Sequence, residues 1–312
     1  MIIYNYPDKE KLNINECALA LGFFDGVHIA HRDLMATARE AAKSKGLAFG
    51  IFTFASTGGI KSNAKRLFDD CEKAEIFDSL GADFVVYADF SKLAGLSPED
   101  FVKKTLIGDL NCRICVAGFN FRFGKGASGN SDDLARLMAE SGGEAIIKDE
   151  ITAEGITLSA TLIRELISEG KIEEANRYLG APYYIKGRVT HGRADGRKLG
   201  FPTANIPIDT QKATPKSGVY RSAVTIDGRI YGCVSNLGVC PTFDGEETRL
   251  EAHIIGYDGD LYDREIRVYL LGFIREERRF NSLEELKMQI NIDKNKAIEE
   301  NGDITWQELG LK

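Results

Sequence analysis

The sequence changes pattern near residue 180, and this change limits what the chain can fold into. Before it, short apolar runs of strand length alternate with segments in which apolar residues recur every three to four positions. The expected strands are Cys17–Leu21, Ala48–Phe54, Asp83–Tyr87, Arg113–Ala117 and Glu144–Ile147, and the expected helices are Arg32–Ser44, Asp69–Leu80, Pro98–Leu106, Ser131–Glu140, Thr161–Ser168 and Ile172–Leu179. Strands that alternate with helices predict a parallel sheet wrapped by helices.

After Gly180-Ala181-Pro182, which is typical of a boundary, strand-like segments dominate. They cover Tyr183–Val189, Val219–Ile226, Arg229–Val234, Arg249–Ile255 and Ile266–Leu271. Asp227-Gly228 between two of them predicts a hairpin turn, and Ser282 followed by carboxylates predicts the start of a last helix. We expect an antiparallel β-barrel with a terminal helix. Because 312 residues exceed the usual size of one core, we expect two domains, 1–180 and 181–312.

The composition excludes several classes of protein. With 43% hydrophobic residues, 28% charged residues and a net charge of −7, the chain resembles an ordinary soluble protein and gives no sign of a nucleic-acid surface. The N-terminus lacks a basic region followed by an apolar one, and no apolar run approaches the roughly 18 residues of a membrane span. We therefore expect a cytoplasmic protein with neither nucleic-acid nor membrane partners.

The six cysteines indicate no disulfide framework. Cys17, Cys71, Cys233 and Cys240 are isolated in sequence, and Cys112-Arg113-Ile114-Cys115 is a CxxC within an expected strand. A zinc or redox site would need a second ligand pair or a position between a loop and a helix, so buried reduced thiols are the favoured interpretation.

The segment Gly187–Asn205 combines a basic loop rich in glycine with a stiff Pro-Thr-Ala-Asn turn. The glycines allow backbone N–H groups to face an anion, and Pro202 fixes the direction of the residues that follow it. The Thr203 hydroxyl and the Asn205 amide oxygen are hard ligands suited to Mg²⁺ held partly by a triphosphate. The alternative is a glycine-rich surface turn, which the length of the run disfavours.

A second candidate site follows the first strand of the N-terminal half, at Gly22-Phe23-Phe24-Asp25-Gly26-Val27-His28-Ile29-Ala30-His31. Ligands of open parallel sheets lie beyond the carboxyl ends of strands, where a helix N-terminus attracts phosphate. His28 and His31 lie on one side of such a helix start, and both can donate to phosphate oxygens. The alternatives are helix-capping histidines or half of a metal site.

Two further segments carry polar and basic residues that suit a nucleotide site. Gly118–Gly126 follows a strand and brings Asn120, aromatic residues and basic residues to the same sheet edge, although a packed aromatic loop explains it equally well. In Leu158–Arg164, a hydroxyl caps a helix and Arg164 follows in the first turn, which suits a phosphate but also an ordinary capped helix.

Together these three N-terminal segments resemble the FMN adenylyltransferase half of prokaryotic bifunctional FAD synthetases, a Rossmann-like module of the HIGH-motif nucleotidyltransferase superfamily. The resemblance implies that His28 and His31 assist nucleotidyl transfer. It also implies that ATP is bound by Gly22, Phe23, Phe24, Asp25, Asn120, Thr161 and Arg164. The sequence departs from the family at Ala30 (usually Gly), at Ala160 (usually Ser) and at Ala55-Ser56-Thr57-Gly58, where a Pro-His-Pro turn is usual.

The second half resembles riboflavin kinase from Tyr183 to about Ala297. The resemblance rests on Gly187–Asn205, Gly218-Val219-Tyr220, Asn236–Phe243, Leu250–Ile255 and Ile274–Phe280. It implies that ATP is bound by Gly196, Lys198, Gly200, Phe201, Pro202 and Thr203, that Thr203 and Asn205 hold Mg²⁺, and that Arg275 contacts the flavin. Asp263 is a departure, because the family often has Gly there, and His191 and His253 are expected to be structural.

Glu251 is the expected catalytic base, because phosphorylation of a primary hydroxyl needs a base beside that hydroxyl. A carboxylate in an apolar strand faces either solvent or a site, so the alternative is a solvent-facing strand residue. We expect a bifunctional enzyme that converts riboflavin and ATP to FMN, and FMN and ATP to FAD. The rival hypotheses are a kinase with a degenerate adenylyltransferase half, and a non-catalytic flavin carrier or sensor. The oligomeric state stays open.

Overall fold

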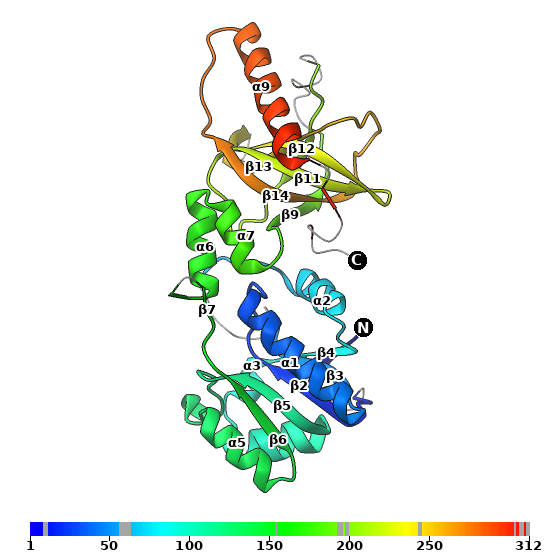
Figure 1. The fold of residues 1–312 in the computed structure, drawn as a ribbon, viewed down its shortest axis with the longest axis vertical. Helices are drawn as coiled ribbons and strands as arrows, with labels where there is room; N and C mark the ends of the chain where they lie inside the picture. The colour runs from blue at the N-terminus through cyan, green and yellow to red at the C-terminus, as the bar shows by residue number, and fades with distance from the viewer. Residues whose placement is uncertain are drawn as a thin grey trace. The chain divides into compact units, whose positions relative to one another are not determined.

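The computed structural model describes residues 1–8, 12–55, 64–153, 155–191, 196, 200–242, 245–302, 304–305 and 309. The chain forms two compact units, Met1–Ser159 and Ala160–Lys312 (Figure 1). The two helices before Gly180 therefore belong to the second unit, whereas the sequence pattern groups them with the first half. The functional boundary at 180 stays a prediction.

The first unit contains a sheet with helices on both faces. Its elements are β1 (Ile2–Tyr6), β2 (Cys17–Leu21), α1 (Ile29–Lys45), β3 (Ala48–Phe54), α2 (Asp70–Ser79), β4 (Phe84–Ala88), α3 (Phe90–Leu93), α4 (Pro98–Asp100), the π-helix η2 (Phe101–Asp109), β5 (Cys112–Gly118), the 3₁₀-helix η3 (Lys125–Ala127), α5 (Ser131–Glu140), β6 (Glu144–Lys148), β7 (Thr152–Ala153) and β8 (Ile156–Thr157). The order in the six-stranded sheet is β1-β4-β3-β2-β5-β6, with every pairing parallel. The predicted α/β fold of this half is confirmed.

The sheet separates two apolar cores, because successive side chains of a strand point to opposite faces. On β2, Leu19 and Leu21 pack with residues of η2 and α5, and Ala18 and Ala20 pack with residues of α1 and α2. All five residues of β2 are buried. This central strand therefore holds the loop that follows it in a fixed place.

Two elements of this unit differ from the expectation. Strand β1 was not predicted, because it is an edge strand whose first two residues, Ile2 and Ile3, are exposed, so no alternation marks it. The expected helix Pro98–Leu106 is instead a short α-turn capped by the Ser97 side chain, followed by a nine-residue π-helix. Apolar spacing does not distinguish these helix types.

The second unit is an antiparallel barrel with helices. Its elements are α6 (Ala160–Glu169), α7 (Ile172–Leu179), β9 (Tyr184–Arg188), β10 (Ala204–Pro207), β11 (Gly218–Ile226), β12 (Arg229–Thr242), β13 (Gly245–Ile254), β14 (Glu265–Arg275) and α9 (Leu283–Asn301). The strand order is β10-β13-β12-β11-β14-β9, and a bridge between Thr190 and Asn205 joins the two edges. The predicted barrel is confirmed, and Ala204–Pro207, expected as part of a turn, forms one of its strands.

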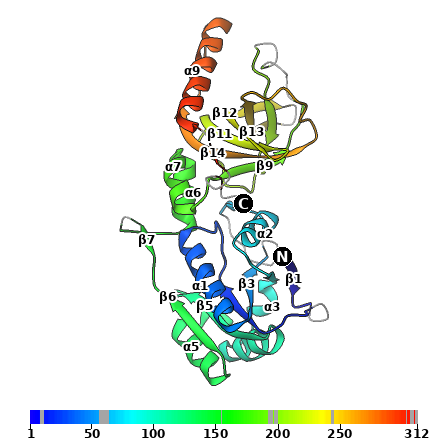
Figure 2. The same cartoon turned by 45° about the vertical axis from the view of Figure 1, so that its right-hand side comes forward.

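The predicted hairpin turn and the predicted helix cap of this half are confirmed as well. Asp227 and Gly228 both have positive φ, 48° and 76°, in the tight turn between β11 and β12. The Ser282 side chain accepts a hydrogen bond from the Glu285 backbone N–H at the start of α9. Figures 1 and 2 both show α9 alongside β11 and β12.

The cysteines of the described residues are free, and Cys17, Cys112, Cys115 and Cys233 are buried, as expected for reduced thiols. The side chain of Cys240 lies outside the description. Among the described residues, no helix is long and apolar enough to cross a membrane.

Candidate functional site

The first candidate site lies where the chain order in the parallel sheet reverses. β2 pairs with β3 on one side and with β5 on the other. The chain continues from β2 to β3 and from β5 to β6, so the connections after these two neighbouring strands run in opposite directions. Ligands of such sheets bind at this switch point, beyond the carboxyl ends of the strands. Ala20 lies opposite Val116, and therefore the Gly22–His31 loop and the Gly118–Gly126 loop start side by side, as the sequence predicted.

The loop after β2 is held in an unusual backbone conformation. Phe24, Gly26 and Val27 have φ values of 49°, 88° and 42°, and Phe24 and Val27 are buried. Arg32 Nε donates to the Val27 carbonyl at 3.0 Å. Gly22 is required by packing, since a Cβ there would lie 2.6 Å from the Phe24 ring. Such left-handed backbone persists where the surroundings over-determine it, which is common at functional sites.

The two histidines form a stacked pair at the start of α1. Their ring centroids are 3.6 Å apart with an angle of 19° between the planes. His28 occupies the N-cap position without a side-chain cap hydrogen bond, so the helix-capping alternative is not supported. Among the described residues, the buried Nδ1 atoms of His28 and His31 have no hydrogen-bond partner.

Burial keeps both rings neutral at pH 7. It lowers the pKa of His28 from 6.5 to about 4. It also lowers the pKa of His31 well below 6.5, with a further contribution from the neighbouring His28. A neutral imidazole carries one N–H donor, and the helix N-terminus beside the pair favours an anion. A neutral ring at this helix start can donate one N–H to a phosphate oxygen.

The other N-terminal candidates lie at the same sheet edge or close to it. Phe23 is exposed, and its carbonyl accepts from Thr53 Oγ1 at 2.9 Å. Asp25 Oδ1 accepts from the Leu67 backbone N–H at 3.4 Å. Asn120 is exposed directly after β5, so its side chain is available to a ligand.

The last N-terminal segment, Leu158–Arg164, spans the boundary, and its residues from Ala160 on belong to the second unit. Ala160, Thr161 and Arg164 are the first, second and fifth residues of α6, and Thr161 is exposed. Their part in adenylyl transfer stays a prediction. Of the other departures from the family, Ala30 is the half-buried second residue of α1, and residues 56–58 lie outside the described part of the chain.

The second candidate site is a row of side chains across the barrel. Register places Asn205, Glu251, Asn236, Val219 and Arg275 opposite one another on five neighbouring strands. Cross-strand neighbours point to the same face of a sheet. The adjacent row containing Ile206, Leu250 and Leu237 is buried inside the barrel, so the row with Glu251 lies on the outer face, where α9 packs.

Two cavities meet at Thr203. One, of about 300 Å³, is lined by Thr203, Glu251 and Arg275, by apolar residues Val219, Val234 and Phe280, and by Leu286 and Ile290 of α9. The other, of about 290 Å³, is lined by Thr203 and Asn205 with Val189, Ala252 and Tyr262. Glu251 thus lines a cavity and does not face only bulk solvent. Thr203 lines the same cavity and also the second one.

Thr203 and Asn205 present adjacent oxygen and amide groups. Asn205 Nδ2 lies 3.4 Å from Thr203 Oγ1 and 3.3 Å from the Thr203 carbonyl oxygen, and the backbone of Asn205 is fixed by a 2.8 Å bond from the Thr190 N–H to its carbonyl. Neutral oxygen donors of this kind fit Mg²⁺ that is bound mainly by phosphate. No group of three or more His, Cys, Asp or Glu suited to a metal exists among the described residues.

The loop before Thr203 is closed on itself. The Phe201 N–H donates to the Gly196 carbonyl at 2.8 Å, and a Cβ on Gly196 would lie 2.5 Å from the Phe201 carbonyl oxygen. His253 Nδ1 lies 3.0 Å from the Pro202 carbonyl oxygen, a contact in keeping with the structural role expected of this histidine. Lys198 lies outside the described residues.

Arg275 forms an ion pair with a carboxylate to which the sequence assigned no role. Its Nε and Nη2 contact both oxygens of buried Asp293 on α9 at 2.7–3.1 Å. The sequence also assigned no role to Asn236 and Glu277. Both line the cavity with Glu251, and Asn236 Nδ2 donates to Glu277 Oε1 at 3.0 Å. The signal for Asn236 is a polar residue inside the strand motif Asn-Leu-Gly.

Asp263 has a φ of 62°. The left-handed region favours glycine, and Asp is among the few other residues that enter it. Aspartate can therefore replace the glycine that the family often has at this position, because it tolerates the same left-handed backbone.

The two sites together define a class of protein: an enzyme with two nucleotide-dependent transfer centres, one in each unit. Comparison with known proteins identifies the class more closely. A family model described as FAD synthetase matches residues 10–162, and one described as riboflavin kinase matches residues 179–300. The chain belongs to the family of bifunctional riboflavin kinase/FMN adenylyltransferases.

Relatives of that name match nearly the whole chain. The Bacillus subtilis protein is 34% identical, covering 90% of this chain and 91% of its own length, and the Listeria monocytogenes protein is 36% identical, covering 91% and 92%. A crystal structure described as a macrolide-efflux protein from Streptococcus pneumoniae is 30% identical with a TM-score of 0.86, covering 95% of this chain and 99% of that one. Its likeness supports the two-domain fold, and the transport role in its description stays with that protein.

The predicted family is thus confirmed. Both domains are present, which supports FAD biosynthesis over a non-catalytic flavin carrier.

Proposed function

We propose that this chain makes FAD in two steps. In the barrel, the riboflavin 5′-hydroxyl takes the γ-phosphoryl group of ATP to give FMN and ADP. In the N-terminal unit, an FMN phosphate oxygen attacks the α-phosphorus of a second ATP to give FAD and pyrophosphate. The observation that carries the proposal is the position of Glu251, in a cavity that shares Thr203 with a second cavity.

The lining of the two cavities favours one assignment of substrates. Val219, Val234, Phe280 and the α9 residues give the Glu251 cavity an apolar surface suited to a flavin ring. The cavity with Asn205 then takes ATP, whose γ-phosphate reaches Thr203. Glu251 accepts the proton of the riboflavin hydroxyl as that oxygen bonds to phosphorus, and ADP leaves on the opposite side.

Thr203 Oγ1 and the Asn205 side-chain oxygen would hold Mg²⁺. The Asn205 amide now turns its nitrogen towards Thr203, so it must rotate to present Oδ1 to the same ion. When bound, Mg²⁺ neutralises charge on the phosphates. The backbone N–H groups of the glycine loop, with Gly196, Lys198 and Gly200, would bind the phosphate oxygens.

For adenylyl transfer, His28 and His31 would donate to the α-phosphate as negative charge develops there. Their position at the N-terminus of α1 supports this role, because the helix dipole there favours an anion. Phe23, Asp25 and Asn120 would contact ATP from the same sheet edge. We further propose that the chain is cytoplasmic and acts on small molecules.

The test is direct. Flavin-free protein is incubated with riboflavin, excess ATP and Mg²⁺, and the products are separated by chromatography with fluorescence detection. FMN followed by FAD is the expected result. FMN alone would show that Ala30, Ala160 and the changed turn have ended adenylyl transfer, and no product would refute the proposal for both units.

A further inference from the structure

Helix α9 is held over the barrel by one small apolar cluster, in which Ala297 packs with Val219 and Val234, and by polar contacts. Of its nineteen residues only Asp293 and Ala297 are buried, and Leu283, Met288 and Ile292 are largely exposed. Yet Leu286 and Ile290 form part of the wall of the Glu251 cavity. Leu286 and Ile290 are only half-buried, so polar contacts near them contribute to the position of this wall.

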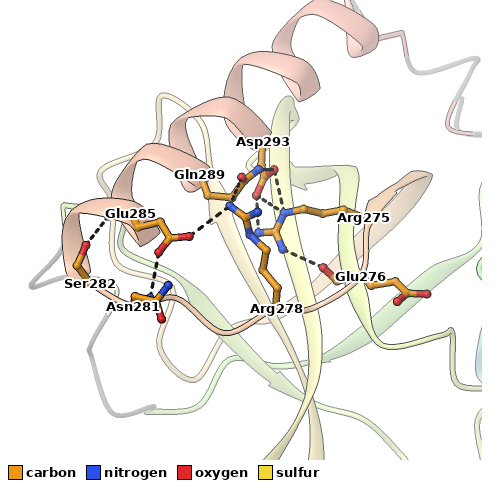
Figure 3. A network of polar contacts seen from close by, with 8 residues as sticks. All are labelled: Arg275, Glu276, Arg278, Asn281, Ser282, Glu285, Gln289 and Asp293. Atoms are coloured by element: carbon orange, nitrogen blue, oxygen red, sulfur yellow. Dashed lines mark hydrogen bonds and ion pairs between the residues drawn. The ribbon is translucent and has the colours of Figure 1, made fainter.

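A network centred on Asp293 supplies these polar contacts (Figure 3). Arg275 at the end of β14 contacts both Asp293 oxygens at 2.7–3.1 Å, and its Nη1 donates to the Glu276 carbonyl at 2.9 Å. Gln289 Nε2 donates to Asp293 Oδ1 at 2.8 Å, and Gln289 Oε1 accepts from Arg278 at 2.7 Å. The network thus joins the helix, the last residue of β14 and the segment after it.

The members of this network lie around the cavity. Arg275, Arg278 and Asp293 all line it, together with Phe280, and the Arg278 guanidinium lies 4.8 Å from the Phe280 ring centroid. The other end of α9 has separate contacts, such as the 3.1 Å bond from Asn301 Nδ2 to the Ser222 carbonyl. Loss of Asp293 would therefore release the cavity wall while the far end of the helix stays attached.

We infer that Asp293 is a positioning residue for the flavin substrate: it orients Arg275 and holds Leu286 and Ile290 at the distance from Glu251 that the isoalloxazine ring requires. This inference rests on the proposed kinase function. Asp293 acts through its neighbours and takes no part in phosphoryl transfer, and the ATP cavity shares neither Asp293 nor α9.

The experiment compares Asp293→Asn with Glu299→Gln in the full-length protein. Glu299 is exposed on the same helix, so the control removes the same charge without touching the network. For Asp293→Asn we expect the KM for riboflavin to rise about tenfold or more, equivalent to about 1.4 kcal/mol or more of binding. The kcat, the KM for ATP and the adenylylation of added FMN should stay within about twofold of wild type, and Glu299→Gln should match wild type throughout.

A second variant, Gln289→Leu, keeps the Arg275–Asp293 pair and removes the two hydrogen bonds of Gln289, one to Asp293 and one from Arg278. We expect a smaller rise in the riboflavin KM, so the test does not depend on the folding of Asp293→Asn. An unchanged riboflavin KM in both variants would overturn the inference. So would a parallel loss of ATP affinity, kcat and thermal stability, which would indicate a purely structural role.

FMN formation by the wild-type protein tests the proposed function separately from the inference about Asp293. If wild type forms no FMN, the kinase assignment fails, and riboflavin binding measured by quenching of its fluorescence then tests the cavity wall. Weaker binding in Asp293→Asn than in Glu299→Gln would support the inference, and equal binding would overturn it.

Discussion

The buried histidine pair makes a quantitative prediction about stability. Burial lowers the pKa of His28 from 6.5 to about 4 in the folded protein. Between these two values the unfolded chain binds a proton that the folded chain does not, so stability falls as pH falls through this window. At pH 4 the accumulated loss from His28 alone is about 3 kcal/mol, a large part of the stability of a typical domain.

Replacing His28 with leucine removes this titration. No cap hydrogen bond is lost, because the His28 side chain makes none. The free energy of unfolding of the variant should therefore rise by about 3 kcal/mol relative to that of wild type between pH 7 and pH 4, so the variant gains relative stability as pH falls. Carboxylates also titrate in this range, but they are common to both proteins and cancel in the difference.

The assay is denaturant unfolding of both proteins at several pH values, followed through the transition of the N-terminal unit. His191→Gln is the control, because His191 is exposed in the barrel unit, and its difference from wild type in this transition should not vary with pH. A difference between His28→Leu and wild type that stays constant from pH 7 to pH 4 would refute the reasoning, since it would mean that His28 is not buried as a neutral ring.

Three further outcomes are expected. Glu251→Gln should lower kcat for riboflavin phosphorylation by roughly 10²–10⁴-fold, with adenylylation of added FMN unchanged; retention of kinase activity would show that Glu251 is not the base. Thr203→Val, which keeps the side-chain shape, should raise the Mg²⁺ concentration needed for half-maximal kinase activity, and an unchanged metal requirement would exclude Thr203 as a ligand. Asp263→Gly should stabilise the barrel by about 0.5 kcal/mol, because glycine relieves the left-handed backbone; thermal unfolding measures this, and a clear loss of stability would contradict it.

Much of the candidate chemistry was predictable because it depends on short segments. The turn at Asp227-Gly228 and the helix cap at Ser282 follow from the preferences of single residues for particular φ values and hydrogen bonds. The histidine pair follows from a strand that leads directly into a helix.

Other features depend on pairing between distant segments. Strand β1 and strand β10 carry no local alternation, and each is a strand only because a partner strand supplies its hydrogen bonds. The link between Arg275 and Asp293 joins positions eighteen residues apart. The sequence assigned Arg275 to the flavin and gave Asp293 no role.

The sequence by itself determined most of the strands and helices, the change from an α/β half to a β half and the motifs that indicate nucleotide chemistry, because apolar periodicity and turn residues act over a few positions. Only the tertiary structure decided which side chains share a cavity. Asn205, Glu251, Asn236 and Arg275 form one row because strand register aligns them, and a shift of a single residue would turn a strand's side chains to the opposite face. Register is set by burial across the whole barrel, and no local pattern contains it.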